Sequence, residues 1–286
     1  MDWESFLDKK CGHPGKTLFH YTTCPGFIGI LDDNCLWATD TRYLNDLEEF
    51  RHGVALFQEV LKRVEQKKEK HDFLVNYPEC IDELLNVGSR LDGKHTYCVS
   101  FTENGNLFSQ WRGYAGNDGL SIGFSPEGLK SSAKNQGFRF MKCLYDEEEK
   151  KAFVHEVVDD FLRHCDDWHN NKALGHFTPI HFGVYLRRMI CFFAPVLKHE
   201  AFFEEEEWRA VHSYGHLQSK MLSSRKSNGI DIPYIVFSLQ DVSIQKIFIG
   251  PCNNLDRVYL KILPTLDLRG LFHVCKKSGI PYRGSL

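Results

Sequence analysis

Apolar positions recur along this chain with two different periods, which predict a mixture of strands and helices. Short apolar runs rich in β-branched and aromatic residues, some alternating with period two, indicate strands. They lie at residues 17–22, 35–39, 96–101, 120–124, 138–145, 207–212, 234–239, 244–249 and 271–275. Segments in which apolar residues recur at spacings of three and four indicate helices. They lie just after residue 23 and at about 47–67, 80–91, 147–168, 181–195 and 255–263.

The order of these elements indicates the fold class. Strands and helices are mixed without the regular alternation of a doubly wound sheet, so we expect an α+β fold. A chain of 286 residues, 42% of them hydrophobic, is long enough to bury one large core. We therefore expect a single domain over residues 1–286, with helical insertions at about 47–91 and 147–195.

Charge and cysteine content exclude several classes of protein. A net charge of -3 provides no basic field of the kind that nucleic-acid-binding proteins carry. The ten cysteines are scattered without a Cys-x-x-Cys pair, which argues against a zinc site and a disulfide framework. The amino terminus lacks signal-peptide features, and the most apolar run, Met189 to Leu197, is too short to cross a bilayer. We expect a cytoplasmic protein with reduced thiols and no membrane partner.

Four consecutive glutamates, at residues 204–207, lead directly into a predicted strand. With period two, Glu207 shares one face of that strand with Arg209 and Val211. An acid at the start of a buried strand, beside an arginine, can have its charge held and tuned, so Glu207 is a candidate site residue. The alternative is an acidic loop in which Arg209 neutralises a neighbouring glutamate.

A second candidate group, His20-Tyr21-Thr22, ends the first predicted strand just before a helix. A histidine there can direct a ring nitrogen at a ribose hydroxyl, and the hydroxyl residues that follow can help to position the sugar. The alternative is a histidine at the edge of the core that bonds a backbone carbonyl.

The predicted loop between the second strand and the long helix is dense in polar side chains. Thr39 ends the strand, and Arg42 offers a planar fork suited to phosphate or carboxylate. Asn45 lies at the start of the helix, where backbone N–H groups favour anions. The alternative is that Asn45 and Asp46 are ordinary helix-capping residues.

Another polar and aromatic group follows the strand at 96–101. Ser100 lies on that strand, while Trp111, Arg112 and Tyr114 lie in a predicted helical turn after it. Trp111 and Tyr114 are suited to stacking on a base or a nicotinamide ring, and Arg112 is suited to a phosphate. The alternative is a turn of helix whose aromatic side chains fill the core beneath it.

Several short motifs, each weak alone, occur in order along most of the chain. They are at residues 18–22, 36–40, 43–46 with Glu49, 98–102, 111–115, 119–124, 198–209 and 278–283. As an ordered set they resemble the bacterial family called domain of unknown function 2971.

The layout of that family is similar to that of the ADP-ribosyltransferase superfamily. The resemblance implies a split β-sheet core, in which a histidine of the first strand binds the NAD ribose and a late-strand glutamate carries catalysis. His20 matches the first position and Glu207 the last, with Glu205 two residues earlier, as in the Glu-x-Glu arrangement of several such transferases. The candidates for the middle position, which supports the nicotinamide, are Trp37, Thr39, Tyr43 and Ser100.

The chemistry implied by this resemblance is coherent. Breaking the nicotinamide–ribose bond builds positive charge on the ribose, as in glycoside hydrolysis. Glu207 would face that charge and bond the ribose 2′-hydroxyl, while Glu205 would orient or deprotonate the nucleophile. Arg42 or Arg112 would hold the pyrophosphate. No metal is required.

The resemblance therefore predicts an enzyme that uses NAD as a substrate, either to transfer ADP-ribose to a macromolecule or to hydrolyse NAD. The acceptor would be a protein or a nucleic acid, and an inhibitor or antitoxin protein is a further expected partner, since a toxin or phage-defence role suits such an activity. Two alternatives remain open. One is a magnesium-dependent nuclease that uses Lys198 with Glu205 and Glu207. The other is a binding module without catalysis, with the helical insertions as its partner surface.

Overall fold

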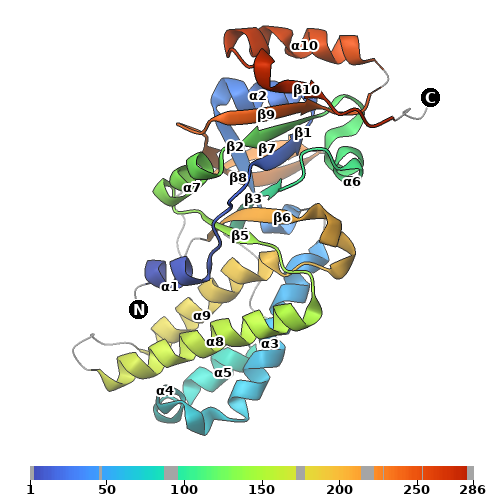
Figure 1. Ribbon diagram of the computed structural model, residues 1–286. Helices are drawn as coiled ribbons and strands as arrows, with labels where there is room; N and C mark the ends of the chain where they lie inside the picture. Colours follow the sequence, from blue (N-terminus) through green and yellow to red (C-terminus); the bar gives the residue numbers. More distant parts are fainter. Residues whose placement is uncertain are drawn as a thin grey trace.

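A computed structural model describes residues 3–44, 47–86, 96–171, 178–213, 222–227, 229–252 and 254–281. Its strands form one large sheet, and most of its long helices gather at one end of the molecule (Figure 1). The mixture of strands and helices without regular alternation, predicted from the sequence, is confirmed. Within the described residues, no helix combines the length and apolarity needed to cross a membrane.

The described strands form a mixed sheet. They are β1 (Leu18–Thr22), β2 (Cys35–Asp40), β3 (Thr96–Thr102), β4 (Leu120–Phe124), β5 (Arg139–Lys142), β6 (Glu207–Ser213), β7 (Leu222–Ser227), β8 (Ile230–Ser238), β9 (Ile244–Ile249) and β10 (Cys275–Lys277). Their order is β10-β9-β4-β1-β3-β2-β8-β7, with β6 also paired to β3 and β5 to β6. The strands pair antiparallel, except that β10 runs parallel to β9.

The sheet divides at β3. One edge of β3 pairs with β6 along its whole length. The other edge meets β1 at Thr102 and β2 at Cys98 and Tyr97. In this register neither β1 nor β2 pairs with the described residues between these points, Val99 to Phe101, so the neighbouring strands diverge there. One arm of the sheet continues through β1, β4 and β9, and the other through β2, β8 and β7.

The described helices are α1 (Trp3–Lys10), α2 (Cys24–Asp33), α3 (Leu47–Glu65), α4 (Asp72–Asn76), α5 (Glu79–Asn86), α6 (Phe108–Gln110), α7 (Pro126–Asn135), α8 (Glu147–Asn170), α9 (Pro179–Phe193) and α10 (Leu255–Leu268). Their ends follow capping rules. The Thr23 hydroxyl accepts from the Gly26 amide at the start of α2, and the Asp146 carboxylate accepts from the Glu149 amide at the start of α8. Asn34 ends α2 in the left-handed conformation that suits a carboxyl-terminal cap.

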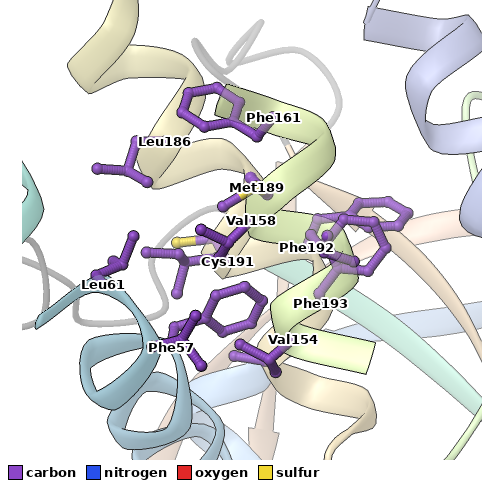
Figure 2. Close-up of a cluster of buried hydrophobic side chains, with 14 of the residues drawn as sticks. Phe57, Leu61, Val154, Val158, Phe161, Leu186, Met189, Cys191, Phe192 and Phe193 are labelled. Carbon is purple, nitrogen blue, oxygen red and sulfur yellow. The ribbon is translucent and has the colours of Figure 1, made fainter. Parts of the chain in front are cut away.

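The two helical segments expected as insertions pack against each other. Buried apolar side chains of α3, α8 and α9 interdigitate in one cluster, which Figure 2 shows with Phe57, Val158, Phe161, Leu186 and Phe193 among its members. Cys98 of β3 and Val211 of β6 join this cluster, so the helices rest on one side of the sheet. A second cluster lies among the strands, α2, α7 and α10.

Some elements differ from the sequence prediction. Helix α7 and strand β7 were not predicted, because each has few apolar residues. The prediction of a closing strand at residues 271–275 is wrong. Residues Phe272–Val274 form a 3-10 turn, and β10 begins only at Cys275, where the backbone aligns with β9.

A close approach between α3 and the turn after α9 predicts an unusual substitution effect. A β-carbon added at Gly53 would lie 2.5 Å from the Ala194 carbonyl oxygen and 2.8 Å from its α-carbon. Alanine is normally the better helix former, but here the backbone of Ala194 would have to move to make room for the added β-carbon. We therefore expect Gly53→Ala to lower the free energy of unfolding by about 1–3 kcal/mol.

Urea unfolding measures this effect, and Gly29→Ala in α2 is the matched control. No atom lies within 4 Å of a β-carbon added at Gly29, so this change should stabilise the protein by about 0.5–1 kcal/mol. Stabilisation by both substitutions would contradict the close packing of α3 on Ala194.

Candidate functional site

A pocket of about 1050 Å³ lies where the sheet divides. Its walls come from β1, β2, β3, β6 and β7, from α2, and from the segment Lys198 to Glu205. The predicted site residues that line it are His20, Thr22, Thr39, Ser100, Tyr114, Glu205 and Glu207. The structure thus brings the histidine of the first strand and both candidate glutamates to one cavity.

The acidic end of the pocket is a network of two carboxylates and two cations. The Lys198 Nζ atom lies 2.6 Å from Oε2 of Glu205 and 2.6 Å from Oε2 of Glu207. The Arg209 guanidinium donates from Nε to Oε1 of Glu207 at 2.7 Å and from Nη2 to Oε2 at 3.1 Å. All four side chains are buried. A buried carboxylate so surrounded keeps its charge.

The local backbone explains how both glutamates reach Lys198. Residues Glu200–Glu205 form a 3-10 helix, and Glu206 follows in the left-handed conformation, with φ of 44°. This single reversal places Glu205 and Glu207 on the same side, while Glu204 and Glu206 stay exposed. The run is therefore neither a plain acidic loop nor a uniform acidic surface. Its alternate members are buried, and Arg209 does pair with one of them.

The two buried glutamates differ in acidity. Burial alone would raise the pKa of Glu207, but the charges of Arg209 and Lys198 and their hydrogen bonds outweigh it and lower the pKa to about 2. Burial raises the pKa of Glu205, and the nearby charge of Glu207 adds to this rise, although Lys198 opposes it. Glu207 is therefore ionised at neutral pH, and Glu205 is the better proton acceptor of the two.

Glu207 lines the pocket and retains some hydrogen-bonding capacity. A carboxylate offers about four lone-pair sites, and the bonds from Lys198 and Arg209 occupy one on Oε1 and two on Oε2. Oε1 can therefore accept one more donor. For Glu205, the hydrogen bond described is the one from Lys198 to Oε2, so its Oε1 can also accept.

His20 lies in the gap between the two arms of the sheet. Its Nδ1 atom lies 2.9 Å from the Ser100 carbonyl oxygen, in the stretch of β3 that neither β1 nor β2 covers. Because a carbonyl only accepts, Nδ1 carries the proton and Nε2 is an acceptor. Burial lowers the pKa of His20, and the nearby charge of Arg225 lowers it further, so the ring is neutral at pH 7.

The part of the pocket wall formed by β2 and β7 is aromatic and cationic. The rings of Trp37 on β2 and Tyr234 on β8 stack with centroids 4.6 Å apart. The Arg225 guanidinium on β7 lies 5.4 Å from the Trp37 ring centroid and donates to the Thr39 hydroxyl at 3.2 Å. The sequence prediction included Thr39 but missed Arg225, because the polar segment around it gave no strand signal.

Two of the predicted binding residues, Tyr21 and Trp111, are not part of the lining of the large pocket. Trp111 is buried against the Tyr21 ring, at a centroid distance of 4.6 Å, which matches the core-packing alternative. The Tyr21 hydroxyl bonds the backbone of Asn104 and Leu107. Tyr21 borders a smaller cavity of about 50 Å³, whose lining also includes His20, Glu205 and Glu207.

The two arginines proposed for the pyrophosphate do not line the pocket either. Arg42 forms an ion pair with Asp40, two residues earlier, in which Nη2 of Arg42 lies 2.7 Å from Oδ2 of Asp40. Arg112 lies 5.9 Å from the Phe108 ring centroid, outside the pocket lining. Asn45, the remaining predicted binding residue, lies outside the described residues.

The arrangement of charges bears on metal binding. Among the described residues, no group of three or more histidine, cysteine or acidic side chains is placed to hold a metal ion. Glu205 and Glu207, the acids of the nuclease alternative, have the Lys198 ammonium between them. A divalent cation would have to displace that ammonium, so the residues present do not fit a two-carboxylate metal site.

Comparison with known proteins gives a family but no named relative. No curated protein and no solved structure matches the chain. The segment that does match a family model begins at α6 and ends in β6, and so contains Lys198, both buried glutamates and Arg209. Over residues 110–210 this protein matches the family described as Protein of unknown function (DUF2971), which confirms the family that its sequence motifs indicated.

Proposed function

We propose that the pocket binds NAD and that the protein cleaves the nicotinamide–ribose bond, in the manner of an ADP-ribosyltransferase. One observation carries the proposal: His20 and Glu207, on strands on opposite sides of β3, line the same pocket where the sheet divides. Its volume of about 1050 Å³ suits a dinucleotide, since pockets for smaller ligands span about 300–1,000 Å³.

Glu207 supplies the charge that the reaction needs. The bond from ribose C1′ to the nicotinamide nitrogen breaks, its electron pair leaves with nicotinamide, and positive charge develops on the ribose. A carboxylate held ionised by Arg209 and Lys198 faces that charge without reorganising, so it stabilises the transition state more than the ground state. The free lone pair on Oε1 is suited to a ribose hydroxyl.

Glu205 acts as the general base that accepts the proton of the nucleophile. Water or an acceptor hydroxyl forms the new bond to C1′, and its proton passes to a base. The raised pKa of Glu205 brings this carboxylate closer to the working pH, where a general base is most effective. The products are nicotinamide and either ADP-ribose or an ADP-ribosylated acceptor, which would be a protein or a nucleic acid.

His20 orients the sugar. The Ser100 carbonyl fixes its tautomer, and Nε2 accepts a hydrogen bond from a ribose hydroxyl. Because its pKa is lowered below the usual 6.5, His20 stays neutral across neutral pH. Protonation, which would abolish this acceptor, therefore begins only at more acidic pH.

His20→Ala tests this assignment. Loss of a ligand hydrogen bond of about 1–3 kcal/mol corresponds to a drop of roughly 5- to 150-fold in kcat/KM for nicotinamide release from NAD. His273→Ala is the matched control, because the Nδ1 atom of His273 also bonds a backbone carbonyl but the residue lies outside the pocket. Its kcat/KM should equal that of the unaltered protein.

Assays of nicotinamide release, of nuclease activity and of NAD binding, the first two with and without a chelator, distinguish the alternatives. Nicotinamide release that persists in a chelator supports the proposal. Nuclease activity that a chelator abolishes, without nicotinamide release, would replace it with the metal-dependent alternative. Binding of NAD without any release would favour a module without catalysis.

A further inference from the structure

Strand β7 contributes an arginine to the pocket wall. The proposed cleavage of NAD does not use this side chain. Arg225 lies half-buried on β7, and the pocket is lined by it together with Trp37 and Thr39 of β2. The strand register places these three on one face of the arm formed by β2, β8 and β7, because β7 and β2 both pair with β8. Arg225 therefore belongs to the part of the pocket wall that this arm forms.

The charge of Arg225 is not matched within the pocket. Lys198 and Arg209 form ion pairs with Glu205 and Glu207. In the described part of the chain, the contacts of the Arg225 guanidinium are the Thr39 hydroxyl and the Trp37 ring, and no carboxylate lies at ion-pair distance. Arginine stays protonated even when buried. The pocket wall formed by β2 and β7 thus carries a positive charge that can pair with an anionic group of a ligand.

The guanidinium is also held in place before any ligand arrives. The indole of Trp37 lies beneath it, and Tyr234 stacks on that indole with an interplanar angle of 24°. The bond to Thr39 uses one of its five N–H donors. The remaining donors of a planar fork suit two oxygens of one phosphate.

We propose that Arg225 is the phosphate-binding residue of the pocket, holding the diphosphate of a nucleotide ligand against the wall formed by Trp37 and Thr39. This assignment rests on the proposed NAD chemistry and replaces Arg42 and Arg112 in that role. His20 and Arg225 line the same pocket. A ligand that carries a diphosphate on the 5′ carbon of a ribose can therefore present its sugar to His20 and its diphosphate to Arg225.

Isothermal titration with three ligands tests the proposal. ADP-ribose carries the diphosphate and ribose, inorganic pyrophosphate carries only the anion, and nicotinamide riboside carries no phosphate. Arg225→Gln should weaken ADP-ribose and pyrophosphate binding by about 10- to 100-fold, the effect expected of a charged hydrogen-bonding pair. Its affinity for nicotinamide riboside should not change.

Two further variants sharpen the test. Arg225→Lys keeps the charge without the fork, so its affinity for ADP-ribose should fall between those of the other two forms. Arg112→Gln is the matched control, because Arg112 also lies over an aromatic ring but outside the pocket. It should bind all three ligands as the unaltered protein does.

The outcomes separate this inference from the proposed function. Binding of pyrophosphate that depends on Arg225, in a protein that never releases nicotinamide, would keep the phosphate site and refute the NAD chemistry. Equal affinity of the unaltered protein and Arg225→Gln for ADP-ribose, or binding of neither anion by the unaltered protein, would overturn the phosphate site. An equal loss of affinity for nicotinamide riboside and for ADP-ribose in Arg225→Gln would also overturn the phosphate site. Arg225 would then only maintain the shape of the pocket wall.

Discussion

Replacing Glu207 with glutamine is expected to abolish most nicotinamide release and to destabilise the fold at the same time. Loss of one fixed charge facing the transition state costs about 10²- to 10³-fold in kcat. The same change leaves Lys198 and Arg209 buried with one carboxylate fewer. Breaking a buried ion pair from one side typically costs about 3–5 kcal/mol, so we expect a loss of that order in the free energy of unfolding.

The pH dependence of stability checks the structural half of this prediction. The pKa of Glu207 is lowered from 4.5 to about 2 in the folded protein, so its stabilising contribution is complete above the unfolded value. That contribution, about 3 kcal/mol at 1.36 kcal/mol per pKa unit, is lost as the pH falls from 4.5 toward 2. Urea unfolding across this pH range should show this loss of stability in the unaltered protein. The loss should be absent from Glu207→Gln.

Glu206→Gln is the control for that experiment. It removes one charge from the same run at an exposed side chain, so neither stability nor nicotinamide release should change. If Glu207→Gln unfolded at the same urea concentration as Glu206→Gln and kept its rate, the buried network would have neither role.

Replacing Glu205 with glutamine should separate catalysis from stability. We expect nicotinamide release to fall by about 10²- to 10⁴-fold, the contribution of a general base. Burial raises the pKa of Glu205, so its charged form opposes folding and stability falls as the pH rises through the folded pKa. Removing that charge leaves Lys198 paired with Glu207, so stability at pH 7 should be unchanged or slightly higher.

Rescue by azide identifies the role of Glu205. Azide attacks C1′ without giving up a proton, so it should restore turnover in Glu205→Gln by forming the azido sugar. It should not restore Glu207→Gln, where stabilisation of the ribose charge is lost. Full activity of Glu205→Gln without azide would show that another group accepts the proton.

The elements that the sequence predicted well have strong periodic patterns. Helix α3 has an apolar stripe that includes Phe57, Val60 and Leu61, and these side chains are buried as the stripe requires. Strand β7 could not be found in this way, since the segment Leu222–Ser227 has one apolar residue and is held by pairing with β8. Local periodicity reports burial, and an edge strand with little burial leaves no such signal.

Residues of the candidate site could be predicted where their chemical type and their position on a strand both indicated it. Glu207 and Arg209 share a face because strands alternate with period two, and the structure joins them in an ion pair. Trp111 and Arg42 have residue types suited to binding, but their partners, Tyr21 and Asp40, are contacts within the fold. Arg225 reaches Thr39 across 186 residues of sequence, and no local pattern encodes that contact.

A structure of the protein with a non-hydrolysable NAD analogue is the decisive test of the proposed NAD site. We expect the nicotinamide-side ribose between Nε2 of His20 and Oε1 of Glu207, with the diphosphate against Arg225. A ligand bound outside this pocket, or a pocket left empty at saturating analogue, would refute the proposed site.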